Sequence, residues 1–167
     1  NNAGLAAGKD PIQYGKRDNW ERMIDTNVKG LLYVSEQIIP GMIARKSGHI
    51  INISSTAGKE AYAGGNVYCA TKHAVEAITE GMRIDLLPHN IRVGRVSPGM
   101  VETEFSLVRF DGDKNTADAT YAGLEPLHPE DVADAIYYMA SRPAHVCIND
   151  LVILPTAQAN STTVFRN

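Results

Sequence analysis

Three polar side chains in the middle of the chain form a chemically coherent set. Tyr68 and Lys72 lie four positions apart in a segment with helical periodicity, so they share one helix face. Ser55 follows a short run of β-branched residues, and the 13 positions from it to Tyr68 leave room for a loop that returns to the same crevice. A phenol is a poor base at neutral pH, but a neighbouring ammonium favours the phenolate. The set therefore predicts proton transfer to or from an alcohol or ketone oxygen.

Each of these assignments has a simpler alternative. A tyrosine and a lysine four positions apart are common on helix surfaces, so the pair alone predicts no site. Ser54 competes with Ser55, although alternation along a strand turns neighbouring side chains to opposite faces. Asn27, on an otherwise apolar helix face, either satisfies buried backbone groups or holds a water. Only the joint occurrence of these residues favours a catalytic site.

Alternating helices and short strands must position these side chains. Apolar residues recur at helical spacing from Asp18, a candidate N-cap, to Met42, and another helix begins at Pro129 and ends before Pro143. The helix that carries the tyrosine and the lysine spans 66–87, and the predicted strands are 49–54, 91–96 and 151–154. Such alternation implies a mainly parallel sheet with helices on both faces and with ligands at the carboxyl ends of its strands.

Composition and charge exclude several functional classes. The 167 residues carry a formal net charge of -3 with acidic and basic residues interspersed, so the chain lacks the basic field that nucleic acid requires. No stretch is long and apolar enough to span a bilayer. Cys69, Cys147 and the five histidines show no metal-ligand spacing, which predicts no metal site and favours free thiols in a reducing compartment.

In combination, these residues resemble the classical short-chain dehydrogenase/reductase family. The order and spacing of Asn1–Gly4, Asn27, Ser55, Tyr68–Lys72 and Ser97–Gly99 match that family over essentially the whole chain. The resemblance implies an α/β fold, a Rossmann-like doubly wound parallel sheet in three α/β/α layers, and an NAD(P)-dependent oxidoreductase that acts on CH-OH donors.

The resemblance also implies a role for each residue of the set. Tyr68 would be the catalytic acid/base, and both Tyr68 and Ser55 would bind the substrate oxygen. Lys72 would tune Tyr68 and bind the nicotinamide ribose, and Asn27 would hold a water of the proton relay. The implied cofactor contacts are Asn2, Ala3, Gly4, Tyr68, Lys72, Pro98, Gly99, Val101 and Thr103.

Five further stretches resemble a bacterial subgroup, the NADP-dependent 3-hydroxy acid dehydrogenases, also called serine 3-dehydrogenases or L-allo-threonine dehydrogenases. These stretches are 48–53, 62–68, 101–105, 129–133 and 142–146. The likeness implies hydride transfer between NADP(H) and the 3-hydroxyl or 3-keto group of a small hydroxy acid or amino acid, by a cytoplasmic homotetramer. Two alternatives stay open: a carbonyl reductase of the same family acting on apolar ketones, and a non-catalytic dinucleotide-binding protein. NAD also stays open, because the residues that read the 2′-position belong to a first βαβ unit that is not in this sequence.

We expect residues 1–167 to be the C-terminal part of a single NAD(P)-binding domain, whose first strands belong to a longer parent chain. Residues 100–128 are a predicted substrate flap with a short helix inside it. Residues 155–167 are a polar tail without regular pattern, for which the subgroup likeness implies contact with another subunit. Arg109 in the flap has two interpretations, a bidentate clamp for a substrate carboxylate or, more simply, an exposed loop arginine.

Overall fold

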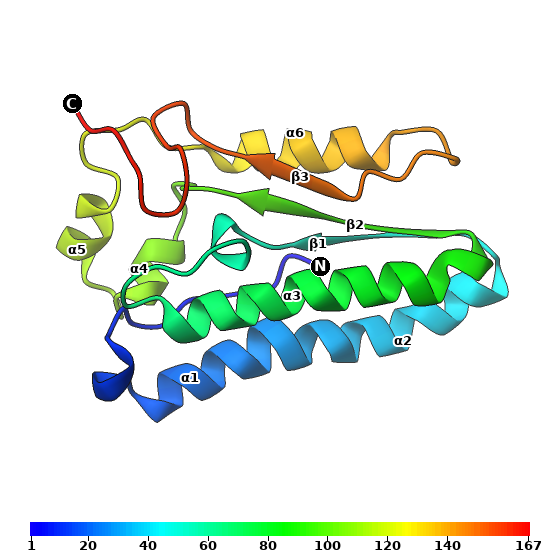
Figure 1. The fold of residues 1–167 in the computed structure, drawn as a ribbon, viewed down its shortest axis with the longest axis horizontal. Helices are drawn as coiled ribbons and strands as arrows, with labels where there is room; N and C mark the ends of the chain where they lie inside the picture. The colour runs from blue at the N-terminus through cyan, green and yellow to red at the C-terminus, as the bar shows by residue number, and fades with distance from the viewer.

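A parallel three-stranded sheet forms the centre of the molecule. The computed structural model describes residues 1–167, with β1 (Gly48–Ile53), β2 (Ile91–Pro98) and β3 (Asp150–Ile153) side by side in that order. Ile50 is paired with Val93, and Val96 with Leu151. The predicted strands are confirmed to within two residues at each end. All three carboxyl ends point to the same end of the molecule (Figure 1).

Helices cover both faces of this sheet. One face carries α1 (Arg17–Ile24), α2 (Leu31–Ala44) and α3 (Asn66–Leu86), and α3 lies in the connection from β1 to β2 (Figure 1). The opposite face carries α6 (Pro129–Ala140), which lies in the connection from β2 to β3. The three-layer, Rossmann-like arrangement is therefore confirmed. None of the helices has the length and apolarity needed to cross a bilayer. The short helical turns are η1 (Ile12–Tyr14), η2 (Asp25–Gly30), η3 (Thr56–Gly58) and η4 (Leu87–His89).

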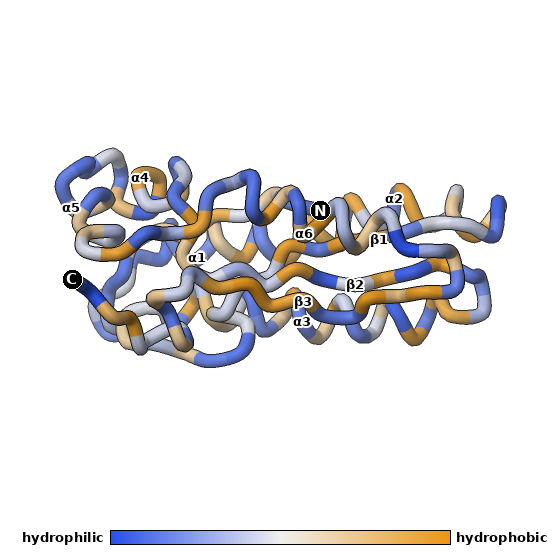
Figure 2. The backbone as a smooth tube through the Cα atoms, turned by 90° about the horizontal axis from the view of Figure 1, so that it is seen from above, coloured by the Kyte–Doolittle hydropathy of each residue, from blue (hydrophilic) through white to orange (hydrophobic).

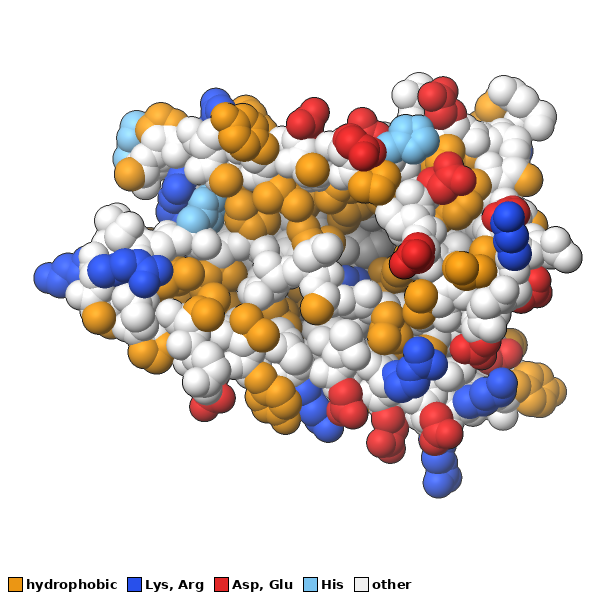
Figure 3. Space-filling model, turned by 180° about the vertical axis from the view of Figure 1, so that it is seen from behind, with side chains coloured by type: hydrophobic (Ala, Val, Ile, Leu, Met, Phe, Trp, Pro, Cys, Tyr) orange, Lys and Arg blue, Asp and Glu red, His pale blue; other side chains and the backbone are white.

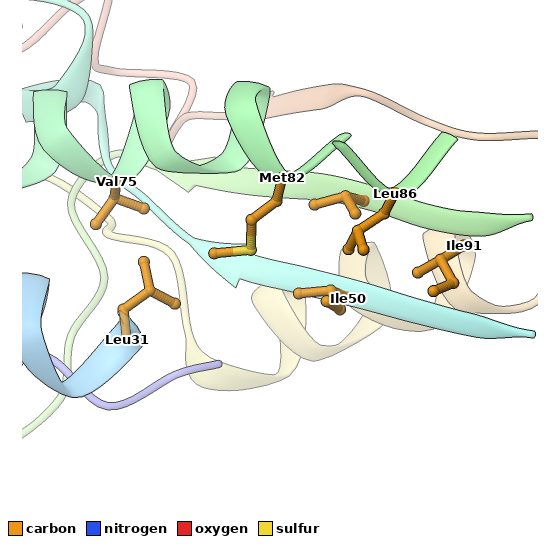
Figure 4. Close-up of a cluster of buried hydrophobic side chains, with 7 residues drawn as sticks. Leu31, Ile50, Val75, Met82, Leu86 and Ile91 are labelled. Atoms are coloured by element: carbon orange, nitrogen blue, oxygen red, sulfur yellow. The ribbon is translucent and has the colours of Figure 1, made fainter. Parts of the chain in front are cut away.

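The main core lies between the sheet and the helices α2 and α3. Alternate side chains of β1 and β2 point toward these helices and are removed from water, which is the main favourable term in folding. Figure 4 shows this cluster, whose buried members are Leu31, Ile50, Val75, Met82, Leu86, Ile91 and Val93. On the other face, Met139 of α6 is fully buried against Gly94, where a Cβ would lie 2.8 Å from the Met139 Cε. A side chain at Gly94 would therefore separate α6 from the sheet.

The predicted first helix is not a single regular element. A wider π-helical turn, η2, lies between α1 and α2, and such turns occur often at functional sites. The prediction that Asp18 is the N-cap is wrong, because helical geometry already begins at Arg17 and Asp18 lies inside the first turn. There its carboxylate is close to the positive end of the helix dipole, which explains why an acid suits this position.

The flap and the tail lie together at the end of the molecule to which the strands point. The flap contains two short helices rather than one, α4 (Phe105–Arg109) and α5 (Lys114–Ala119) (Figure 2). Hydrogen bonds between backbone groups close its base: the Glu102 N–H donates to the Leu127 carbonyl at 2.8 Å, and the Leu127 N–H donates to the Met100 carbonyl at 2.9 Å.

The tail contacts its own chain. The Ser161 N–H donates to the Glu60 carboxylate at 2.6 Å, and the Asn167 N–H donates to the carbonyl of Gly123, which follows α5, at 2.9 Å. The tail contains no helix or strand, as expected, but these hydrogen bonds fold it back onto its own chain. A polar sequence does not reveal such partners, which are distant along the chain.

The face seen from behind is hollowed between α6 and α2, and apolar side chains line the hollow (Figure 3). Ile51 and Ile53 point to this side of β1 and are half-buried. The first residue lies along the free edge of the same strand. The Asn1 ammonium donates to the Ile51 carbonyl at 2.8 Å, and the Ile53 N–H donates to the Asn1 carbonyl at 3.0 Å. Asn1 thus forms two hydrogen bonds with the backbone of β1, on the edge of this strand that β2 does not occupy.

Candidate active site

The hydroxyl groups of Ser55 and Tyr68 meet where β1 ends and α3 begins. Ser55 follows β1 and caps η3, because its Oγ accepts the Ala57 N–H at 3.2 Å and donates to the Pro98 carbonyl at 3.4 Å. Tyr68, in the first turn of α3, is only 7% exposed, and its ring lies 5.6 Å from that of Phe105 in the flap. The Ser55 hydroxyl is close enough to stabilise the ionised phenol of Tyr68.

Lys72 lies one helical turn beyond Tyr68, on the same face of α3. Its side chain is buried, and its ammonium donates to the Ile53 carbonyl at 3.0 Å, which holds it at the carboxyl end of β1. The Lys72 Nζ lies 5.9 Å from the centre of the Tyr68 ring. The structure thus brings together the serine, the tyrosine and the lysine that the sequence pattern singled out.

Burial dominates the electrostatics of this set. Burial, reinforced by the neighbouring Tyr62, raises the pKa of Tyr68, while Ser55 and Arg109 act in the opposite direction. Burial also lowers the pKa of Lys72 to about 8, against the opposing effect of the Glu76 carboxylate. Lys72 is not among the groups that shift the pKa of Tyr68, so desolvation, which favours the neutral phenol, sets the direction here, and the tuning of Tyr68 by Lys72 stays a prediction. At neutral pH Tyr68 therefore carries its proton.

Ser54 does not compete for the role of Ser55. Its side chain is buried on the opposite side of the chain, where a Cβ added to Gly58 would lie 2.7 Å from the Ser54 Oγ. The Ser54 N–H donates to the Val96 carbonyl at 2.8 Å and continues the pairing of β1 with β2. Strand alternation, as expected, separates the two serines.

Asn27 lies in the π-helical turn η2 and connects it to two distant segments. Its Oδ1 accepts the Leu5 N–H at 2.8 Å, and its Nδ2 donates to the Leu5 carbonyl at 2.8 Å and to the Thr71 Oγ1 at 3.0 Å. With 2% exposure, the side chain satisfies buried polar groups, which is one of the two interpretations that the sequence left open. Asn27 thereby holds Leu5, the residue after Gly4, and a Cβ at Gly4 would lie 3.4 Å from both the Asn27 Oδ1 and the Lys72 Nζ.

The predicted cofactor contacts follow the carboxyl ends of the strands. Asn2 and Ala3 line a cavity of about 90 Å³ together with Asn27, Ile53 and Lys72. A Cβ at Gly4 would lie 3.4 Å from the Lys72 Nζ, so the backbone of Gly4 lies directly beside the ammonium.

The remaining predicted contacts begin where β2 ends. Gly99 passes so close to Gln158 that a Cβ would overlap its side chain, and the Gln158 Oε1 accepts the Met100 N–H at 2.8 Å. Val101 lies at the base of the flap, where its carbonyl accepts the Tyr121 hydroxyl at 2.8 Å. Thr103 is exposed and its Oγ1 accepts the Phe105 N–H at 3.2 Å. Pro98, Gly99, Val101 and Thr103 therefore form one continuous path from the sheet into the flap.

The sequence left the role of Arg109 open and gave no sign of Tyr62, and the structure places both beside Tyr68. Arg109, the last residue of α4, is not an exposed loop arginine: its guanidinium lies 5.7 Å from the centre of the Tyr68 ring and 5.6 Å from that of Tyr62. The Arg109 Nη1 donates to the Tyr62 hydroxyl at 3.0 Å. These contacts join segments that are far apart in the sequence, so no local sequence pattern predicts them.

Comparison with known proteins places this arrangement in a family. The family described as short chain dehydrogenase matches residues 1–113, which include Asn27, Ser55, Tyr68 and Lys72. The chain belongs to the short chain dehydrogenase family. The resemblance inferred from the motifs is thereby confirmed, as is the fold that it implied.

Within this family, the chain is similar to dehydrogenases of hydroxy acids and of serine. An NADP-dependent 3-hydroxy acid dehydrogenase of Escherichia coli (strain K12) is 49% identical over 160 residues, and one of Schizosaccharomyces pombe is 42% identical over 166 residues. These alignments cover 95% and 99% of this chain but 64% of each relative, so the chain spans somewhat less than two thirds of their length. The closed form of a serine dehydrogenase complexed with NADP+ is 46% identical, with a TM-score of 0.94 over 99% of this chain and 67% of that one. Serine dehydrogenase from Escherichia coli is 41% identical, with a TM-score of 0.79 over 94% of this chain and 62% of that one.

Proposed function

We propose that this protein transfers a hydride between NADP(H) and the 3-hydroxyl or 3-keto group of a small hydroxy acid or amino acid, such as serine, allo-threonine or a 3-hydroxy acid. The observation that carries the proposal is the convergence of the Ser55 and Tyr68 hydroxyls with the Lys72 ammonium beneath the flap. The identity of 49% to an NADP-dependent 3-hydroxy acid dehydrogenase supports the substrate class.

The chemistry proposed for the side chains follows from their environment. In the reductive direction, protonated Tyr68 donates its proton to the substrate oxygen, and the Ser55 hydroxyl donates a hydrogen bond to the same oxygen. In the oxidative direction, Tyr68 must first lose its proton and then accepts that of the substrate hydroxyl. The buried Lys72 ammonium supplies a positive charge close to the phenol ring of Tyr68. Asn27 holds the backbone of Leu5, next to the predicted cofactor contact Gly4. Asn27 as the holder of a relay water stays a prediction.

The residues present fit a nicotinamide dinucleotide. Lys72 uses one of its three N–H groups on Ile53, so two donors remain for ribose hydroxyls next to Gly4. We propose that Asn2, Ala3, Gly4 and the path from Pro98 to Thr103 line this cofactor. When bound, its nicotinamide ring accepts or supplies the hydride. NADP is favoured over NAD by the names of the relatives.

The proposal also covers the cellular location and the oligomeric state of the protein. Both cysteines are free, which suits a reducing compartment, and we place the protein in the cytoplasm on that ground. The homotetramer stays a prediction from the family resemblance, because the contacts described above lie within one chain.

A substrate panel on the complete protein tests the proposal. With NADP+, serine, allo-threonine and 3-hydroxybutyrate should be oxidised with kcat/KM at least about 10-fold above that for apolar alcohols of similar size, a difference of about 1.4 kcal/mol. With NADPH, apolar ketones should be poor substrates. Turnover of apolar ketones without turnover of the small acids would instead identify a carbonyl reductase. Tight NADP binding without any turnover would identify a non-catalytic dinucleotide-binding protein.

A further inference from the structure

The guanidinium of Arg109 is built into the roof of the site. Its Nε donates to the Gly8 carbonyl at 3.2 Å, and the Gly8 N–H donates back to the Arg109 carbonyl at 2.9 Å. Its Nη1 donates to the Tyr62 hydroxyl at 3.0 Å. Two aromatic rings lie close to the guanidinium: the ring centres of Tyr62 and Tyr68 are both within 6 Å of its central carbon. Three separate segments therefore hold this one side chain in a fixed position.

The fixed guanidinium nevertheless has no anionic partner in the chain. None of the ion pairs of the structure includes Arg109. The Arg109 Nη2 is buried and donates to no group. The nearby acids of the flap, Glu102, Glu104 and Asp111, are exposed to solvent instead. A half-buried cation whose Nη2 has no partner is costly, so an arginine held in this way is expected to meet an anion when the site is in use.

The position of Arg109 relative to Tyr68 indicates which anion it would bind. The guanidinium lies over the phenol ring on the flap side, and Lys72 lies at the same ring from the sheet side. A molecule whose hydroxyl or keto oxygen reaches Tyr68 and Ser55 would place a group a few bonds away next to Arg109. The Nη1 and Nη2 atoms form one edge of the guanidinium, and this edge matches the two oxygens of a carboxylate.

We propose that Arg109 binds the carboxylate of the substrate and thereby selects small acids over neutral ketones and esters. This inference rests on the proposed function and names the residue that determines its substrate class. Tyr62 acts as the positioning residue, because its hydroxyl holds the Nη1 of Arg109. Selectivity should be high, because the buried Nη2 stays without a partner when a neutral analogue is bound.

The test compares an acid with its ester in the complete protein. The Arg109→Gln and Arg109→Lys variants are assayed with 3-hydroxybutyrate and with its methyl ester. We expect kcat/KM for the acid to fall about 10- to 100-fold, mainly through KM, and kcat/KM for the ester to change less than about 3-fold. Lys114→Gln removes a cation from α5 in the same flap, where the side chain is exposed, and should leave the acid-to-ester ratio unchanged.

A binding measurement that needs no turnover accompanies the kinetics. Butyrate and butyramide are titrated against the protein with NADPH bound, using the cofactor fluorescence. Wild type should prefer butyrate, Arg109→Gln should lose that preference, and NADPH should bind both proteins equally. Equal losses for acid and ester, or an unchanged preference for butyrate, would overturn the role of Arg109. Failure of the proposed function would appear differently, as absent turnover by wild type, and the butyrate titration would still decide whether Arg109 binds a carboxylate.

Discussion

Tyr68 shows how strongly the environment of one residue decides its chemistry. From spacing alone, the neighbouring lysine was expected to favour the phenolate. In the folded protein, the ring packs on Phe105 beneath the flap, and burial raises the pKa of Tyr68. Because the flap is distant in the sequence, its desolvating effect is not visible in the motif. The position of Tyr68 was predictable from the sequence, whereas its protonation state depends on long-range packing.

Lys72 gives a prediction that links this environment to stability. Its pKa is about 8 in the folded protein and 10.5 as a model value, so between these pH values the unfolded chain binds the extra proton. Lys72 should therefore add to the free energy of unfolding as the pH rises from about 8 to 10.5, by up to roughly 3 kcal/mol. The free energy of unfolding of wild type, relative to that of Lys72→Met, should rise by this amount.

Urea unfolding at pH 7 and pH 10, without cofactor, measures the difference. Lys114→Met, which changes an exposed lysine, should behave like wild type. An identical pH dependence in wild type and Lys72→Met would show that burial does not penalise the ammonium of Lys72.

At the scale of elements, a charged cluster joins the catalytic helix to the sheet. Glu76, one turn beyond Lys72 on α3, pairs with Arg95 of β2 at 2.5 Å and with Lys59 at 2.5 Å. Asp150, at the start of β3, pairs with Lys59 and with Arg95, the latter at 3.0 Å. The Arg95 side chain is only 12% exposed, so its pairs are screened less than surface pairs. This cluster fixes α3 against β2 and β3 below the reacting groups.

Asp150→Asn should weaken this connection. Although burial opposes ionisation, the Lys59 and Arg95 cations hold the pKa of Asp150 below its usual value. Its carboxylate therefore stabilises the fold above about pH 4, the ordinary pKa of an aspartate, and this contribution is lost as the pH falls through the lower folded pKa.

Chemical unfolding at pH 7 should show Asp150→Asn destabilised by roughly 1–3 kcal/mol, with a smaller difference from wild type near pH 3. Asp134→Asn, an exposed site on α6, is the matched control and should have no effect. Equal stability of wild type and Asp150→Asn at pH 7 would contradict the role of the cluster.

The elements themselves were largely predictable from periodicity. Strands 49–54, 91–96 and 151–154 and the helix 66–87 appear nearly as expected, because apolar spacing and proline stops are local signals. The π-helical turn at Asn27 was not predictable, since its hydrogen bonds to Leu5 and Thr71 come from distant segments. The contacts of Arg109 with Gly8 and Tyr62, and those of the tail with Glu60, were not predictable for the same reason.

At the scale of the whole molecule, the parallel sheet collects all of the proposed site at one end. The carboxyl ends of the strands, the start of α3, the flap and the tail lie together there (Figure 1). The flap is held at its base by Gln158 of the tail and at the end of α4 by the contact of Arg109 with Gly8. These contacts make the roof of the site a product of segments from both ends of the chain. The chain spans 64% of the length of its relatives, so activity belongs to measurements on the complete protein.

Tyr68→Phe in the complete protein is the most direct test of the account. The variant keeps the ring that packs on Phe105 and removes only the hydroxyl, so the fold and the cofactor site should remain. We predict that kcat for oxidation of 3-hydroxybutyrate falls by about 100- to 10,000-fold, the range expected for loss of a general acid/base, while the Kd for NADP+ changes less than about 3-fold. A kcat close to that of wild type would contradict the assignment of Tyr68 as the acid/base, and with it the proposed chemistry of the site.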